Sequence, residues 1–169
     1  MKIFLTGGAG FIGSNLLDEL LIENEVVVID NFDDFYDVNI KEKNLDEAKN
    51  KKNFSLIKGD ICDEELINSI FKHNRFDLVI HLAAKAGVRP SILNPKLYYK
   101  VNIDGTLNLL EAMKNNGVAN MIFASSSSIY GNNKKTPFSE DDFVDHPISP
   151  YAATKKAGEL LCHTFHHLQ

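Results

Sequence analysis

The stretch "KIFLTGGAGFIGSNLL", residues 2–17, joins a short apolar run to a helical pattern through a cluster of glycines. The run Lys2–Thr6 is typical of a buried strand, and apolar residues then recur at helical spacing from Ile12 to Leu21. A glycine turn at this junction lets the backbone approach a phosphate closely, and the helix N-terminus offers N–H groups to it. The stretch therefore predicts a dinucleotide-binding strand–turn–helix unit.

Apolar runs and helical patterns alternate along the rest of the chain. We expect further strands at Glu25–Asp30, Phe54–Asp60, Phe76–Ala84 and residues 118–125, and helices at 11–24, 64–73, 95–117 and 149–169. Asp63 is expected to cap the second of these helices, and Ser149 the last, with Pro150 at its first position. Continuous apolar strands separated by helices are typical of a parallel sheet that is covered on both faces. The predicted fold class is α/β, a Rossmann-type doubly wound parallel sheet with the strand order 3-2-1-4-5.

Two segments interrupt this regularity. Residues 31–53 are polar and of mixed charge, which predicts a surface excursion with one short helix. Residues 131–147 are polar with two prolines, which predicts a loop over the carboxyl edge of the sheet. Long loops at that edge are usually functional.

Composition excludes several classes of protein. A chain of 169 residues predicts a single domain, 1–169, and 44% hydrophobic with 24% charged residues is typical of a soluble globular protein. The net charge of −5 argues against a nucleic-acid partner, and no apolar run is long enough to span a bilayer. Two cysteines favour a reducing, cytoplasmic location. His163 and His167 have no third ligand at suitable spacing, so no metal site is expected.

The residue that ends the second predicted strand selects the cofactor. Asp30 lies about 20 residues after the glycines, where a carboxylate can bind the ribose hydroxyls of NAD and repel the 2′-phosphate of NADP. No arginine follows at residues 31–34, so we expect NAD. Asp60 ends the third predicted strand, where it could approach the adenine or cap the next helix.

Serines and a Tyr/Lys pair predict the reaction chemistry. The stretch "FASSSSIYG", residues 123–131, places four serines at the end of the fifth predicted strand, where ligands bind in doubly wound sheets. Tyr151 and Lys155 lie four apart on one helix and face the same way. A nearby cation stabilises the phenolate of a tyrosine, which could then act as general base toward a sugar hydroxyl.

These motifs together carry a family resemblance. The stretches "TGGAGFIG", "GDICD", "HLAAKAGVR", "VNIDGTLNLLEA", "SSSSIYG" and "YAATKKAGE" resemble an extended short-chain dehydrogenase/reductase. The closer resemblance is to the nucleotide-sugar 4-epimerases. Within that group, "NFDDFYD" and "AAKAGVRPSI" are most similar to the UDP-glucuronate 4-epimerases.

The resemblance implies roles for individual residues. Tyr151 matches the base, Lys155 its partner, and Ser126 the catalytic serine or threonine, with Ser127 and Ser125 as competitors. The positions that match the lining of the NAD site, besides Tyr151 and Lys155, are Gly7, Gly10, Phe11, Ile12, Asp30, Asn31, Asp60, Ile61, Leu82, Ala83, Ala84 and Asn102. Arg89 matches a contact of a sugar carboxylate, although a surface salt bridge would equally explain it, and Ser127 is a second candidate for substrate binding.

The function implied is C4 epimerisation of a UDP-sugar by transient oxidation to a 4-keto sugar, with UDP-glucuronate as the expected substrate. A 4,6-dehydratase would carry Asp-Glu after the catalytic residue, where this chain has Ser127 and Ser128. Family members are about twice as long, so we expect the amino-terminal, NAD-binding part of such an enzyme with the substrate domain missing. An NAD-binding fragment without turnover is therefore a second alternative. The helical pattern 95–116 is a candidate homodimer surface.

Overall fold

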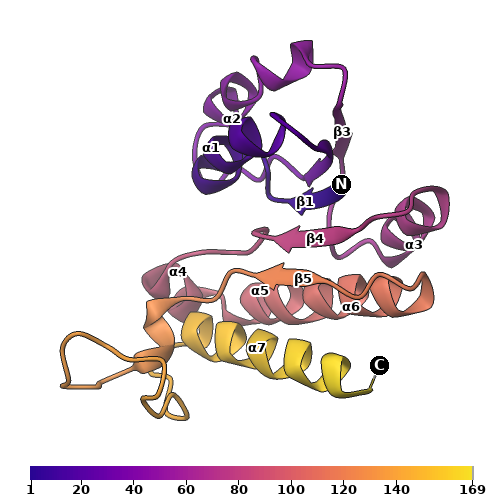
Figure 1. Cartoon of the computed structure of the whole chain (residues 1–169). Helices are drawn as coiled ribbons and strands as arrows, with labels where there is room; N and C mark the ends of the chain where they lie inside the picture. Colours follow the sequence, from indigo (N-terminus) through magenta and orange to yellow (C-terminus); the bar gives the residue numbers. More distant parts are fainter. Residues whose placement is uncertain (169) are drawn as a thin grey trace. The chain divides into compact units, whose positions relative to one another are not determined.

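The computed structural model describes residues 1–168. This part of the chain contains one parallel sheet of five strands (Figure 1). The strands are β1 (Lys2–Thr6), β2 (Glu25–Asp30), β3 (Phe54–Lys58), β4 (Leu78–His81) and β5 (Met121–Phe123). Their order is β3-β2-β1-β4-β5, and every neighbouring pair is parallel. The predicted fold class and strand order are confirmed.

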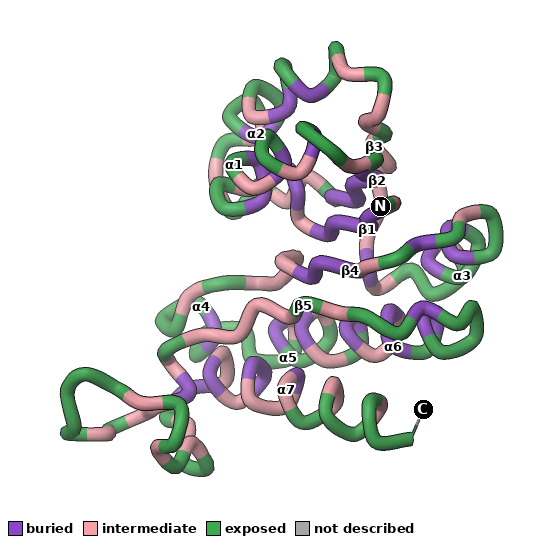
Figure 2. The backbone as a smooth tube through the Cα atoms, viewed as in Figure 1, coloured by how far each residue is buried: buried purple, intermediate pink, exposed green. Residues whose placement is uncertain are grey.

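The central strand β1 is the best buried part of the sheet. Ile3, Phe4 and Leu5 have no exposed surface, and Leu5 is in register with Val28 of β2 and Ile80 of β4. Burying each such side chain contributes about 1.5–3 kcal/mol. Figure 2 shows the same concentration of buried residues along β1, β2 and β4. The centre of the sheet therefore holds the strand that leads into the glycine turn.

The chain divides into two compact units, and the sheet belongs to the first, residues 1–83 and 108–124. The helices of this unit are α1 (Phe11–Leu20), α2 (Val38–Asn44), the 3₁₀ turn η1 (Ala48–Asn50), α3 (Glu64–His73) and the second part of α6 (Gly105–Asn115). The predicted cap of α3 is confirmed, because the side chain of Asp63 accepts a hydrogen bond from the Leu66 N–H at 3.0 Å.

The second unit, residues 84–107 and 125–168, is helical. It contains α4 (Val88–Leu93), α5 (Pro95–Tyr99), the π-helical turn η2 (Lys100–Asp104), the start of α6, the 3₁₀ turn η3 (Ser127–Tyr130) and α7 (Pro150–Leu168). Within this unit α7 packs against α4, α5 and η3. No helix in residues 1–168 is both long enough and apolar enough to cross a membrane.

Several predicted boundaries were wrong. The first helix ends at Leu20, and the third, fourth and fifth strands are shorter than expected, so the four serines follow β5 rather than ending it. The helix expected at 95–117 is broken by the π turn, inside which the carbonyl of Asn102 accepts a hydrogen bond from the Thr106 hydroxyl at 2.7 Å. Helix α4 was not predicted, because its short sequence has no clear periodicity.

Candidate functional site

The predicted site residues are distributed over both units. The first unit holds Gly7, Gly10, Phe11, Ile12, Asp30, Asn31, Asp60, Ile61, Leu82 and Ala83, and the second holds Ala84, Arg89, Asn102, Ser126, Ser127, Tyr151 and Lys155.

Backbone atoms leave no room for a side chain at two glycines of the turn in the first unit, Gly7 and Gly13. Gly7 has a φ of +73°, and a Cβ there would lie 2.7 Å from the backbone nitrogen of Ala83. A Cβ on Gly13 would lie 2.3 Å from the carbonyl oxygen of Gly7. The nearest contact of a Cβ on Gly10 would be wider, 3.3 Å from the same oxygen. The turn is therefore a tight backbone cradle that depends on glycine.

Helix α1 begins directly at this turn. Gly10 is the N-cap and supplies no side-chain hydrogen bond to the first turn of the helix. Such uncapped N–H groups, together with the helix dipole, favour an anionic ligand. Phe11 and Ile12 follow with 78% and 68% of their surfaces exposed, which is unusual for large apolar residues and suits the wall of a ligand site.

Asp30 at the end of β2 is buried and held as a hydrogen-bond acceptor. One carboxylate oxygen accepts from the Ala9 N–H at 3.0 Å, and the other accepts from the Phe32 N–H at 2.9 Å. The ammonium group of Lys41 lies 3.7 Å from the second oxygen. These contacts fix the carboxylate beside the glycine turn and leave it lone pairs for a ligand's hydroxyl groups.

Asp60 forms a hydrogen bond with another predicted cofactor residue, Asn31. One carboxylate oxygen accepts from the side-chain amide of Asn31 at 3.0 Å, and the other accepts from the Cys62 N–H at 2.8 Å. The alternative of a helix cap for Asp60 is wrong, since Asp63 caps α3. Ile61, the next residue after Asp60, is buried.

The end of β4 lies against the start of the glycine turn. The hydroxyl oxygen of Thr6 accepts a hydrogen bond from the Ala83 N–H at 3.1 Å and lies 2.7 Å from Nδ1 of His81. Leu82 and Ala83 are half-buried. The structure thus brings these two predicted residues to the turn within the first unit.

Helix α2, which lies in the segment expected to be a surface excursion, supports the turn directly. The side-chain amide of Asn44 donates to the carbonyl of Ala9 at 3.0 Å, and Lys41 reaches Asp30 from the preceding turn of the helix. A usable sequence signal was the three-residue spacing of Lys41 and Asn44, which places both on one face of a helix capped by Asp37.

Helix α7 of the second unit carries Tyr151 and Lys155. The predicted cap is confirmed, because the Ser149 hydroxyl oxygen accepts from the Ala152 N–H at 3.1 Å and α7 begins at Pro150. Tyr151 is half-buried, whereas Lys155 is buried, and burial lowers the pKa of its ammonium group to about 8. Because pH 7 lies below that pKa, the protonated form of Lys155 prevails there.

The Asn102 side chain forms hydrogen bonds with two separate segments of the second unit. Its side-chain oxygen accepts from the Lys85 N–H at 2.8 Å, and its side-chain nitrogen donates to the Lys85 carbonyl and to the Thr154 hydroxyl, both at 3.0 Å. Thr154 lies between Tyr151 and Lys155 on α7. The Asn102 side chain therefore ties α7 to the segment that begins at Ala84.

The four serines have different surroundings. Ser125 donates a hydrogen bond to the carboxylate of Glu159 on α7. Ser126 is the N-cap of η3, and its hydroxyl oxygen accepts from the Ser128 N–H at 3.2 Å. Ser127 is exposed. Ser125 is thus engaged with a carboxylate, while Ser126 and the exposed Ser127 lie at the start of η3.

Arg89 lies on α4 and is exposed. Within residues 1–168 it forms no ion pair, so the salt bridge considered from the sequence is absent from the described part of the chain.

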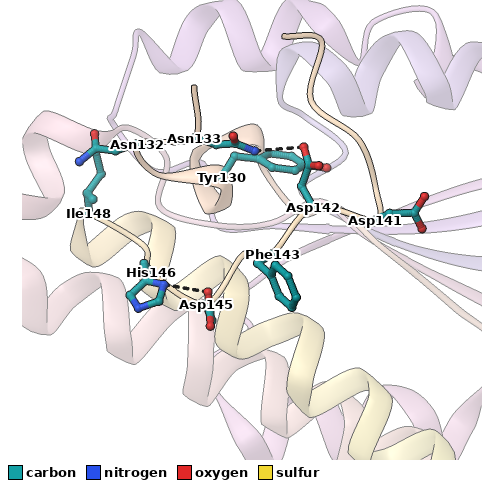
Figure 3. Close-up of a pocket in the computed structure, with 9 residues that line it drawn as sticks. All are labelled: Tyr130, Asn132, Asn133, Asp141, Asp142, Phe143, Asp145, His146 and Ile148. Carbon is teal, nitrogen blue, oxygen red and sulfur yellow. Dashed lines mark hydrogen bonds and ion pairs between the residues drawn. The ribbon is translucent and has the colours of Figure 1, made fainter. Parts of the chain in front are cut away.

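A cavity of about 580 Å³ lies in the second unit, within the loop that follows η3 (Figure 3). None of the predicted catalytic residues lines it. The Asp142 carboxylate accepts from the Asn133 amide at 3.0 Å and the Ser139 N–H at 2.9 Å, and Asp145 pairs with His146 at 2.8 Å. The polar groups of this cavity therefore serve to hold the loop together.

Several known proteins that are similar to the chain are named as epimerases. The UDP-glucuronate 4-epimerase of Thermodesulfobacterium geofontis is 50% identical over 165 residues, which cover 97% of this chain and 51% of the relative. UDP-glucuronate 4-epimerase 4 of Arabidopsis thaliana is 45% identical, with 99% of this chain and 39% of the relative covered. The chain spans about half the length of the curated relatives it matches.

A solved structure shows the same fold. The UDP-glucuronic acid 4-epimerase of Bacillus cereus in complex with UDP-glucuronic acid and NAD is 38% identical, with a TM-score of 0.89 over 99% of this chain and 52% of that one. A family model described as GDP-mannose 4,6 dehydratase matches residues 4–169. The glycine turn, the parallel sheet and this match over almost the whole sequence show that the chain belongs to that family of extended short-chain dehydrogenases/reductases.

Proposed function

We propose that the chain is the NAD-binding and proton-transferring part of a nucleotide-sugar 4-epimerase that interconverts UDP-glucuronate and UDP-galacturonate. The proposal is supported by the names of the relatives and by the residues that both units hold in place.

The first unit supplies the groups that would hold NAD. The cradle at Gly7, Gly10 and Gly13 and the uncapped start of α1 suit the pyrophosphate, and Asp30 suits the hydroxyls of the adenosine ribose. Phe11, Ile12 and the half-buried Ala83 would provide apolar walls. The residues present therefore fit a dinucleotide.

The second unit supplies the groups for proton transfer. NAD, when bound, provides a hydride acceptor for C4 of the sugar and returns the hydride within the same cycle. Tyr151 takes the proton of the C4 hydroxyl as general base, and Lys155, as a cation one helical turn away, stabilises the phenolate. Ser126, with Ser127 as its competitor, orients the C4 hydroxyl. The proton returns from Tyr151 when the 4-keto sugar is reduced on its other face.

The burial of Lys155 is the observation that carries the proposal. Burying its ammonium group costs the folded chain about 3 kcal/mol at neutral pH, judged from the drop in its pKa from 10.5 to about 8. Ionisable groups that bear such a cost cluster at functional sites. Lys155 lies on the same face of α7 as Tyr151, which is the arrangement that the proposed proton transfer requires.

Three further features belong to the proposal and rest on the sequence. The exposed guanidinium of Arg89 suits the carboxylate of glucuronate. The helical segment 95–116 is a candidate homodimer surface, and a cytoplasmic location follows from the two cysteines.

A 4,6-dehydratase is the second candidate, because the matching family model carries that description. Elimination of water across C5 and C6 needs an acid and a base beside the catalytic hydroxyl. The two residues after Ser126 are Ser127 and Ser128, which cannot fill those roles at neutral pH. We therefore favour epimerisation.

The test joins residues 1–169 to the second half of the T. geofontis relative, which is 50% identical over the matched half. With NAD and UDP-glucuronate, the chimera should form UDP-galacturonate, separated by anion-exchange chromatography. The Tyr151→Phe chimera should lose turnover and keep its NAD affinity, since the phenol acts in the chemical step. The 169-residue chain alone should not turn over, because remote binding of the nucleotide holds the reactive geometry.

Three outcomes would count against the proposal. A 4-keto-6-deoxy product from UDP-glucose would favour the dehydratase. A folded chimera that binds NAD without converting UDP-glucuronate would favour a binding fragment without turnover. Unchanged turnover in the Tyr151→Phe chimera would remove Tyr151 from its role.

A further inference from the structure

The hydroxyl of Tyr36 is a buried polar group with unused hydrogen-bonding capacity. Tyr36 lies between β2 and α2, and its Oη is the one side-chain nitrogen or oxygen atom within residues 1–168 that is fully shielded from water without a hydrogen-bond partner. Leaving such a group unsatisfied costs about 1–3 kcal/mol. An unsatisfied hydroxyl in a chain that otherwise pairs its buried polar groups calls for a functional explanation.

The position of this hydroxyl points to the phosphate-binding turn. Oη lies 3.8 Å from the point where a Cβ on Gly10, the N-cap of α1, would be. The Phe11 N–H is close enough to act on the hydroxyl electrostatically, although it makes no hydrogen bond of normal geometry. The phenol therefore lies beside the same uncapped helix start that suits a pyrophosphate.

The surroundings keep the phenol protonated and in place. Burial, reinforced by the nearby carboxylate of Asp30, raises the pKa of Tyr36 above its usual value of 10. The ammonium group of Lys41 lies 5.2 Å from the centre of the ring and 3.7 Å from Asp30, so the ring is held between α2 and the turn. Tyr36 is thus a neutral donor whose hydroxyl has no side-chain or backbone partner of normal geometry within residues 1–168.

We propose that Tyr36 is a further cofactor-binding residue, whose O–H donates a hydrogen bond to the pyrophosphate of the bound dinucleotide. The inference rests on the proposed NAD site. Asp30 is committed to ribose hydroxyls, and a carboxylate repels phosphate, so the glycine turn needs an additional donor on the α2 side. A phenol donates to phosphate without adding a charge beside Asp30.

The test is calorimetric titration of the 169-residue chain with NAD, ADP-ribose and adenosine. Tyr36→Phe removes only the hydroxyl and should weaken the binding of NAD and ADP-ribose by about 10- to 150-fold, the range for a hydrogen bond to a charged group. It should leave adenosine binding unchanged, because adenosine has no phosphate. The matched control is Tyr99→Phe, at a half-exposed tyrosine of α5, which should change none of the three affinities.

Measuring the stability of Tyr36→Phe distinguishes a cofactor-binding role of the hydroxyl from a structural role. Since Tyr36→Phe removes an unsatisfied buried group, the urea midpoint should stay the same or rise while the NAD affinity falls. Equal NAD affinity in Tyr36→Phe and the unmutated chain would overturn the inference and leave the NAD site standing. A loss shared equally by adenosine would also overturn it. Absence of NAD binding to the unmutated chain would overturn both proposals.

Discussion

The ammonium group of Lys41 lies 3.7 Å from a carboxylate oxygen of Asp30, and both side chains are buried. The same carboxylate also accepts the N–H groups of Ala9 and Phe32. A buried carboxylate with these partners is fixed in position, which is what a selective contact with ribose hydroxyls requires.

Asp30→Ala should therefore weaken NAD binding by about 1.5–3 kcal/mol, which corresponds to about 10- to 150-fold. The unmutated chain should bind NAD more tightly than NADP, because the carboxylate repels a 2′-phosphate. Calorimetry measures both affinities. Asp34→Ala, at an exposed position of the same segment, is the control and should leave NAD affinity unchanged. Tighter binding of NADP by the unmutated chain would refute the role of Asp30.

Two glycines offer a matched test of the cradle. A Cβ on Gly13 would meet backbone atoms of Gly7 and Gly8 at 2.3 and 2.7 Å, so Gly13→Ala must push the turn and α1 apart. A Cβ on Gly117 would meet nothing within 4 Å, but its φ of +69° disfavours alanine by about 1–2 kcal/mol. Both variants should lower the free energy of unfolding in urea. Only Gly13→Ala should also lower NAD affinity, and intact binding by that variant would contradict the cradle.

The fold, the glycine turn and the position of Asp30 beside it were predictable from the sequence for local reasons. Continuous apolar strands, the glycine turn and the acidic end of β2 are signals carried by neighbouring residues, and the strand order follows from the doubly wound class. The caps at Asp63 and Ser149 are equally local and were confirmed.

The supporting contacts could not be predicted in the same way. The bonds from Asn44 to Ala9 and from Asn102 to Thr154 join residues 35 and 52 positions apart. Polar residues at such positions look like surface residues until the fold brings their partners together. The π turn at Lys100–Asp104 was not predicted either, because apolar periodicity does not distinguish a π turn from an α-helix.

The edge strand β5 predicts self-association. Within residues 1–168 β5 pairs only with β4, and its central residue Ile122 has 54% of its surface exposed. An apolar edge strand can pair with a second copy. The sedimentation coefficient should therefore rise with concentration, and Ile122→Lys should reduce that rise. The control Ile22→Lys, at an isoleucine after α1 with 69% of its surface exposed, should leave it unchanged. A monomer at all concentrations would contradict the prediction.

The buried Lys155 predicts an unusual dependence of stability on pH. Below pH 8 the folded and unfolded chains both carry its proton, so the folded state bears the whole cost of burying the charge. Between its folded pKa of about 8 and its ordinary value of 10.5, the folded chain releases the proton while the unfolded chain retains it. The contribution of Lys155 to the free energy of unfolding therefore rises with pH through that window.

Lys155→Met keeps an unbranched side chain one atom shorter than that of lysine and removes its charge. At pH 7 it should raise the free energy of unfolding by up to about 3 kcal/mol, the equivalent of the lowered pKa. Its advantage over the unmutated chain should shrink steadily as the pH rises from 8 to 10, measured by urea unfolding at each pH. Comparing the two chains cancels the titration of other groups. Lys156→Met, at the half-buried neighbour that pairs with Glu159 at 3.0 Å, should show no such convergence. A constant difference between Lys155→Met and the unmutated chain across this range would show that burial of the Lys155 charge does not oppose folding.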